Sequence, residues 1–277
     1  MGITWFHTGI NMESFWLSGL FLRAVLTGSL LALACGLLGV FLVLRRDAMI
    51  GHGLSHIAFA GVAVGLVLNL LPVLVSIAIC VTGSLFILKL KDRARLPGDT
   101  AIGLLSSGGM ALAVLLSALR KNFGAELAGY LFGDLLALSP AEVYLAGAVV
   151  FLVLVLIVVF YPQLLLMTLD RESAVVAGIK VRRLDRLLVM LTAVTTVLGL
   201  KIVGLLLITG LTVIPAASAL QIARSFRSSL ILSSLFSLIS VLSGIMLAYL
   251  LNLPASAAII SMALLLFGVS LVWRKLR

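Results

Sequence analysis

The sequence predicts an all-α protein, a polytopic membrane helical bundle of about nine transmembrane helices. Two observations carry this prediction. First, the 277 residues are 62% hydrophobic and only 11% charged, with a mean hydropathy of +1.29, and a chain of that kind has too many apolar side chains for one soluble core. Second, basic residues stand in the gaps between long apolar stretches, at alternate ends of them. We expect the whole chain, residues 1–277, to form a single transmembrane domain.

The apolar stretches are long enough to cross a bilayer. Residues 25–44 contain no charge over twenty positions, and at a rise of about 1.5 Å per residue they cover a hydrocarbon core of about 30 Å. Charged and turn residues between the stretches place the spans near 24–44, 50–70, 72–88, 101–119, 141–161, 187–205, 208–223, 229–250 and 256–273.

The loop charges predict the orientation. Basic clusters follow the odd-numbered spans, at Arg45 and Arg46, Lys89 to Arg95, Arg171 to Arg186, Arg224 and Arg227, and Arg274 to Arg277. Because cytoplasmic loops are rich in Lys and Arg, the N-terminus is expected outside and the C-terminus in the cytoplasm. Residues 187–223 carry one charge, Lys201, and are too long for one span and short for two, so eight spans is an open alternative.

Two segments between the spans are expected to fold without crossing the membrane. Residues 122–140 mix glycine, acids and aromatics on the outer side, which favours a short helix there. Residues 163–186 form the longest cytoplasmic loop, with Asp170 and Glu172 placed for the first turn of a short helix and Gly178 for its end. A folded cytoplasmic loop suggests a docking partner.

Charge and cysteine usage exclude other classes. The net charge of +10 arises from loops beside apolar spans, so anionic lipid is the expected counter-charge and nucleic acid is not an expected partner. Cys35 and Cys80 each lie inside an apolar run, far from any CxxC spacing. We interpret both as small buried hydrophobic residues.

A pair of histidines is the main candidate site. His52 and His56 lie four residues apart at the start of the second span, so a helix places them on one face, about 9 and 15 Å in depth from Arg46. Polar groups at that depth are candidates for function, packing against a neighbouring helix being the alternative. HGLSH resembles the HExxH of zinc proteases, but Gly53 stands where the catalytic glutamate is needed. Gly61 and Gly65 continue the helix as a GxxxG packing face.

Three further residues are candidates for the pathway of a cation. Asp134 on the outer segment has the charge to attract a cation, or is an ordinary solvated acid. Lys201 either lines the pathway or extends to the outer interface. Pro215 is expected to break or kink its span and to free backbone carbonyls.

The sequence lacks the motifs of ATP binding and of nucleophilic catalysis, so any energy for its function is expected to come from another protein. The chain has no GxxxxGK[ST] phosphate loop, no Gly-Lys dipeptide and no GxSxG elbow. It is therefore expected not to be an enzyme.

Four stretches together resemble the metal-ion branch of bacterial ATP-binding-cassette permeases, and within it the zinc-uptake permeases. They are GVFLVLRRDAMIGHGLSHIAFAGVAVG at 39–65, GYLFGDLLALSP at 129–140, DRESAVVAGIKVRRLDRLL at 170–188 and KIVGLLLITGLTVIPAASA at 201–219. The resemblance implies a homodimer that docks onto a cytoplasmic ATP-binding subunit and receives metal from an extracytoplasmic metal-binding protein. It implies a transported divalent metal, zinc, and no permanently bound cofactor.

The resemblance also assigns residues. Asp170, Glu172, Ala174 and Gly178 fall where the family has its coupling motif, and His56 falls on the usual histidine of the second span. His52 stands where the family commonly has Asp, a change that favours borderline ions such as zinc. A manganese or iron importer, a siderophore or corrinoid permease, and, in a different class, an intramembrane metallohydrolase are the alternatives.

Overall fold

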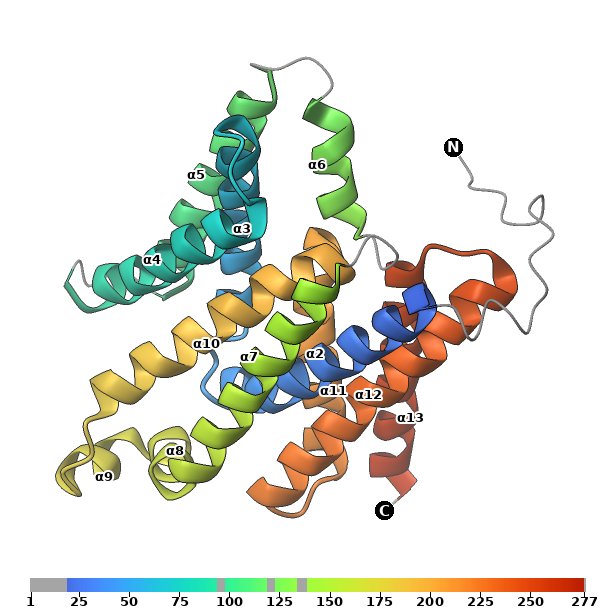
Figure 1. The fold of residues 1–277 in the computed structure, drawn as a ribbon. Helices are drawn as coiled ribbons and strands as arrows, with labels where there is room; N and C mark the ends of the chain where they lie inside the picture. The colour runs from blue at the N-terminus through green and yellow to red at the C-terminus, as the bar shows by residue number, and fades with distance from the viewer. Residues whose placement is uncertain (1–18, 94–97, 119–122, 134–138, 277) are drawn as a thin grey trace.

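The protein is built of α-helices. The computed structural model describes residues 19–93, 98–118, 123–133 and 139–276, and these residues contain no β-strand. Nine of their helices are 18 to 26 residues long: α2 (Gly19–Leu44), α3 (Met49–Val67), α4 (Pro72–Arg93), α5 (Gly98–Ala118), α7 (Pro140–Val159), α10 (Val181–Ile202), α11 (Leu205–Ile222), α12 (Phe226–Leu251) and α13 (Ala255–Leu276) (Figure 1). Three shorter ones are α6 (Phe123–Phe132), α8 (Tyr161–Leu169) and α9 (Arg171–Val176).

The all-helical fold class is confirmed, and a long helix stands at each predicted span. Seven helices of the described chain, α2, α3, α4, α5, α7, α12 and α13, are long and apolar enough to cross a membrane. The exceptions are α10, which has four charged residues in its first two turns, and α11, the shortest of the nine with 18 residues. They are the two halves of the stretch 187–223, so the choice between eight and nine spans stays a prediction.

Local sequence explains where several helices start and stop. Ser139 accepts a hydrogen bond from Glu142 N while the Glu142 carboxylate accepts one from Ser139 N, which forms a capping box at the start of α7. Asn252 ends α12 in the left-handed conformation at φ 53°. Gly204, at φ 88°, makes the turn between α10 and α11. A Cβ there would stand 2.5 Å from the Leu131 carbonyl oxygen, so glycine is required for close contact with α6 as well.

Two hydrophobic clusters meet on α10. The larger is built by α2, α7, α8, α9, α11, α12 and α13, and the smaller by α3, α4, α5 and α6 with Leu205 of α11. Helix α10 contributes to the larger cluster with Leu184, Leu188, Leu191 and Leu198, and to the smaller one with Val189, Ala193, Val197 and Leu200. Because these sets lie on different faces, α10 joins the two parts of the molecule, as its position in Figure 1 shows.

Both predicted short helices are present. Helix α6 occupies part of 122–140, and α9 lies within 163–186 next to α8 and the start of α10 (Figure 1). The C-terminus lies toward the same end of the molecule as α8 and α9 in this view.

Candidate functional site

The two histidines face each other on α3. Their ring centroids are 4.7 Å apart with the planes at 83°, an edge-to-face arrangement. Both side chains are half-buried. His56 Nδ1 is buried and has no hydrogen-bond partner among the described residues. A buried ring nitrogen without a partner is unfavourable in the empty protein and free to bind a ligand.

Glycines bring the neighbouring helices close to the histidine helix. A Cβ on Gly61 would stand 2.6 Å from Ser76 Cα, and one on Gly65 would stand 2.7 Å from Pro72 Cα, both on α4. On the α5 side, a Cβ on Gly109 would lie 3.0 Å from the His56 carbonyl oxygen. The GxxxG packing face predicted from the sequence is therefore confirmed, and it fixes α3 between α4 and α5.

Hydroxyl and thiol groups reinforce this packing. Ser76 Oγ donates to the Ala58 carbonyl at 2.7 Å, and Cys80 Sγ lies 3.4 Å from the Leu54 carbonyl. Cys35 and Cys80 are both free and buried, as expected. Contacts from α4 and α5 thus hold the backbone of α3 that carries His52 and His56.

The pair does not complete a metal site by itself. Among the residues that the structure describes, no group of three or more His, Cys, Asp or Glu side chains is placed to hold a metal ion. Asp134, predicted to attract a cation, lies outside the described residues. His52 and His56 can supply two ligands, and further ligands would come from carbonyls, water or another chain.

Lys201 forms an ion pair that the sequence analysis did not foresee. Its Nζ lies 2.5 Å from Glu142 Oε1, so the end of α10 is joined to the start of α7. Both side chains are largely buried, with 22% and 16% exposed. The Ser-x-x-Glu capping pattern at residues 139–142 was a visible signal for Glu142, but nothing local to it pointed to Lys201.

Pro215 lies inside α11, and the expected break is not found. The helix runs on both sides of the proline, to Ile222. Helix α2 packs against the preceding turn, where a Cβ on Gly39 would stand 2.0 Å from the Thr212 carbonyl oxygen. This close packing supports α11 at the turn that lacks the proline N–H.

The loop 163–186 has a well-capped short helix. Asp170 caps α9 by accepting bonds from Glu172 N and Ser173 N at 3.1 and 3.0 Å, and Ser173 Oγ donates to it at 2.5 Å. These bonds, that of the Ser173 hydroxyl first, lower the pKa of the Asp170 carboxyl from its ordinary value.

Gly178 ends this helix in a Schellman motif. Its φ is +77°, Gly178 N donates to Val175 O, and Ile179 N donates to Ala174 O, both at 3.0 Å. A Cβ on Gly178 would meet nothing within 4 Å, so the backbone conformation alone favours glycine. Ala174 is fully buried, whereas Asp170 and Glu172 are exposed.

Seven described helices that are long and apolar enough to cross a bilayer indicate a multi-pass membrane protein. The chain belongs to the ABC 3 transport family, whose model matches residues 18–274. This membership confirms the family resemblance seen in the sequence, and it accords with a transport subunit rather than an enzyme.

Individual relatives match over nearly the whole chain. The chain is 34% identical over 252 residues to the high-affinity zinc uptake system membrane protein ZnuB of Haemophilus influenzae, covering 91% of this chain and 97% of that one. It is 30% identical over 248 residues to the manganese import system permease protein ScaB of Streptococcus gordonii, covering 90% and 89%. Membrane proteins among its relatives and seven apolar helices confirm a multi-pass protein of the bacterial plasma membrane.

The fold also matches a solved structure. PsaBC from Streptococcus pneumoniae in complex with Fab superposes with a TM-score of 0.84 at 29% identity, covering 93% of each chain.

Proposed function

We propose that this chain is the membrane permease subunit of an ATP-driven importer of divalent metal, and that the metal is zinc. The observation that carries the proposal is the His52–His56 pair, with a buried His56 nitrogen that has no hydrogen-bond partner in the described part of the chain. Imidazole suits zinc and other borderline ions. The zinc relative at 34% identity and the manganese relative at 30% support a divalent metal as the cargo.

The incomplete ligand set favours transit over storage. Two histidines hold a metal less tightly than the three or four protein ligands of resident zinc sites. A metal in transit must leave as readily as it enters, so a partial site whose remaining ligands are water, carbonyls or a second copy of the chain in a homodimer fits this role.

The loop 163–186 is the proposed docking element for a separate ATP-binding subunit. Apolar side chains surround its exposed acids: Leu169 is 65% exposed, Val175 59% and Val176 89%. A partner that covers these side chains gains their burial, and the capped α9 presents them on a fixed backbone. In this proposal ATP hydrolysis belongs to the partner, and an extracytoplasmic metal-binding protein delivers the metal from the other side.

Zinc uptake by cells that depend on this transporter tests the proposed function. The double variant His52→Ala, His56→Ala is expected to lose zinc accumulation while its membrane abundance and its co-purification with the ATP-binding subunit are unchanged. Ser55→Ala is the matched control, since Ser55 lies on the same helix between the histidines and its hydroxyl bonds the His52 carbonyl. Normal zinc uptake by the double variant would refute a transit role for the pair.

The same assay separates the alternatives. Accumulated metal measured by mass spectrometry distinguishes zinc from manganese or iron as the preferred cargo. A metallohydrolase is not supported, since Gly53 leaves the histidine pair without a general base.

A further inference from the structure

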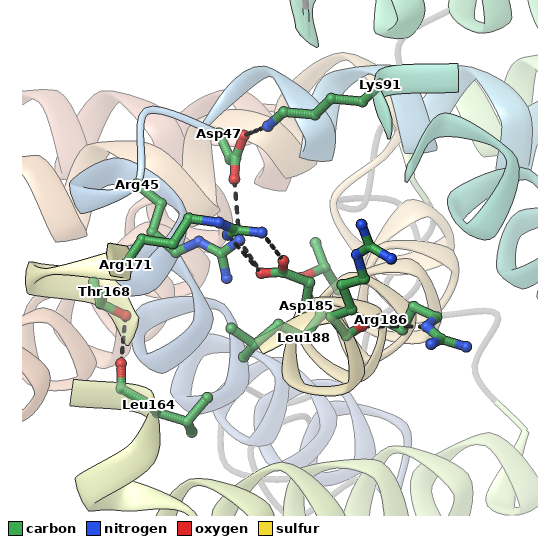
Figure 2. A network of polar contacts seen from close by, with 11 residues as sticks. Arg45, Asp47, Lys91, Leu164, Thr168, Arg171, Asp185, Arg186 and Leu188 are labelled. Atoms are coloured by element: carbon green, nitrogen blue, oxygen red, sulfur yellow. Dashed lines mark hydrogen bonds and ion pairs between the residues drawn. The ribbon is translucent and has the colours of Figure 1, made fainter. Parts of the chain in front are cut away.

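A buried carboxylate joins the loop to the body of the protein. Asp185, in the second turn of α10, is 6% exposed. Arg171, the first residue of α9, donates to both of its oxygens, from Nη2 to Oδ2 at 2.5 Å and from Nη1 to Oδ1 at 3.3 Å. Arg45, just after α2, donates to Oδ1 of the same carboxylate. Figure 2 shows the two guanidinium groups side by side against the Asp185 carboxylate.

The contacts continue from Arg45 toward the histidine helix. Arg45 Nη2 lies 3.5 Å from Asp47 Oδ2, and Lys91 of α4 donates to Asp47 Oδ1 at 2.9 Å (Figure 2). Asp47 precedes the first residue of α3 by two positions, and its carbonyl accepts a bond from Ile50 N at 2.9 Å. A chain of ion pairs therefore runs from α9, through α10, to the start of the helix that carries His52 and His56.

The turn between α2 and α3, where this series of ion pairs ends, is rigid. Asp47 N donates to Leu42 O at 2.8 Å and Arg46 N donates to Val43 O at 3.1 Å, a Schellman pattern that ends α2. Arg46 holds the left-handed position of this motif at φ 59° without being glycine. A displacement of Arg45 therefore moves Asp47 with it, because the one residue between them, Arg46, is held in this hydrogen-bonded turn.

Burial makes the inner part of the network, formed by Arg45, Asp47 and Asp185, act as one unit. The side chains of Arg45, Asp47 and Asp185 are only 11%, 12% and 9% exposed. Pulling one partner away leaves a desolvated charge behind, which is far more costly than moving the connected groups together. Arg171, which reaches α9, is 53% exposed, and its two parallel hydrogen bonds to the Asp185 carboxylate, rather than burial, hold it to the network.

We infer that Asp185 is a positioning residue for transport, and that through Arg171 and Arg45 it passes movement of α9 to the start of α3. The inference rests on the proposed role of the 163–186 loop as the element that docks on the ATP-binding subunit. It adds the route by which nucleotide-driven movement of that loop reaches the histidine pair.

The test uses the complete transporter, with its ATP-binding subunit and metal-binding protein, in proteoliposomes. Arg171→Gln cuts the link to α9, and Arg45→Gln cuts the link to α3. Each is expected to lower the zinc transported per ATP hydrolysed by about fivefold or more, the lower range of coupling between sites. Because the links act in series, the double variant is expected to be no worse than either single one.

Two variants control the experiment. Arg227→Gln removes a like charge from an exposed position in the first turn of α12, outside the 163–186 loop, and is expected to keep the parental ratio. Arg171→Lys keeps the positive charge and is expected to recover part of the ratio. A network that serves stability alone would instead lower the amount of complex and its melting temperature, with zinc per ATP unchanged, and that result overturns the inference.

Gly178→Leu distinguishes this inference from the proposal on which it rests. If Gly178→Leu uncouples transport while Arg171→Gln keeps the parental ratio, the loop couples by another route and only the network inference fails. If Gly178→Leu also keeps the ratio, the loop is not the coupling element, and the inference falls with the proposed role.

Discussion

Gly61 of α3 and Ser76 of α4 lie in direct backbone contact, since a Cβ on Gly61 would stand 2.6 Å from Ser76 Cα. The Ser76 hydroxyl also reaches across to the Ala58 carbonyl, so the two helices are joined by packing and by a hydrogen bond at the same place. The position of the histidine helix depends on this contact.

Gly61→Ala is expected to lower the stability of the permease. The added methyl group meets backbone, which cannot rotate away, and overpacking of this kind costs about 1–3 kcal/mol. Melting of the detergent-solubilised protein measures the effect. Gly51→Ala on the same helix is the control, because a Cβ there meets nothing within 4 Å, and it is expected to leave the melting temperature unchanged or raise it. Equal behaviour of the two variants would contradict the close α3–α4 contact.

Removing the charge of Glu142 is expected to destabilise the contact between the start of α7 and the end of α10. Glu142→Gln keeps the capping box, since Gln also serves at that position, but leaves Lys201 without its carboxylate. We expect a loss of about 1–3 kcal/mol in the free energy of unfolding, and the double variant Glu142→Gln, Lys201→Met is expected to recover much of it. Melting temperatures of the parent and the two variants check this, and a double variant no more stable than Glu142→Gln would contradict a cost for the unpaired Lys201.

His52→Asp is expected to keep zinc uptake and to raise manganese uptake relative to zinc. Carboxylate oxygen suits manganese better than imidazole nitrogen does, so the change shifts preference rather than removing a ligand. Accumulated metals measured by mass spectrometry give the ratio. His52→Asn, similar in size but without the charge, is the control; if it produces the same shift, the ligand chemistry of residue 52 does not set the preference.

Gly178→Leu is expected to leave the permease folded and bound to its ATP-binding subunit, yet to make ATP hydrolysis unresponsive to the metal-loaded binding protein. A side chain at φ +77° costs about 1–2 kcal/mol in local strain, which distorts the end of α9 without affecting the core. Gly178→Asn is the control, since Asn tolerates the left-handed conformation. ATPase activity of the purified complex is the measurement, and a parental response in Gly178→Leu would leave the loop as a linker only.

Single cysteines test the predicted orientation, in a variant that lacks Cys35 and Cys80. Lys180 and Asn252 are both exposed on the protein, so neither is shielded by folding, and only the membrane can protect a cysteine at either position from a reagent added outside. A cysteine at 180 is expected to be protected from an impermeant thiol reagent in intact cells, and one at 252 to be labelled. Labelling at 180 would reverse the orientation inferred from the basic loops.

Sequence alone determined the features whose signals lie within a few residues of one another. The positions of the long helices follow from unbroken apolar runs between charged loops. Three local features each depend on one or two residues and their near neighbours: the helix cap at Asp170, the helix end at Gly178 and the close-packing face at Gly61 and Gly65. Local sequence patterns therefore predict them.

Only the tertiary structure decided which distant groups meet. Asp185 and Arg45 are 140 positions apart, and Lys201 and Glu142 are 59 apart. Their pairing depends on how α10 packs against α2 and α7 at once. Pro215 shows the same limit, since a proline that breaks an isolated helix stays inside α11 where α2 packs against the preceding turn. Side-chain pairing across helices is a product of packing, and packing is set by the whole set of apolar faces rather than by any local pattern.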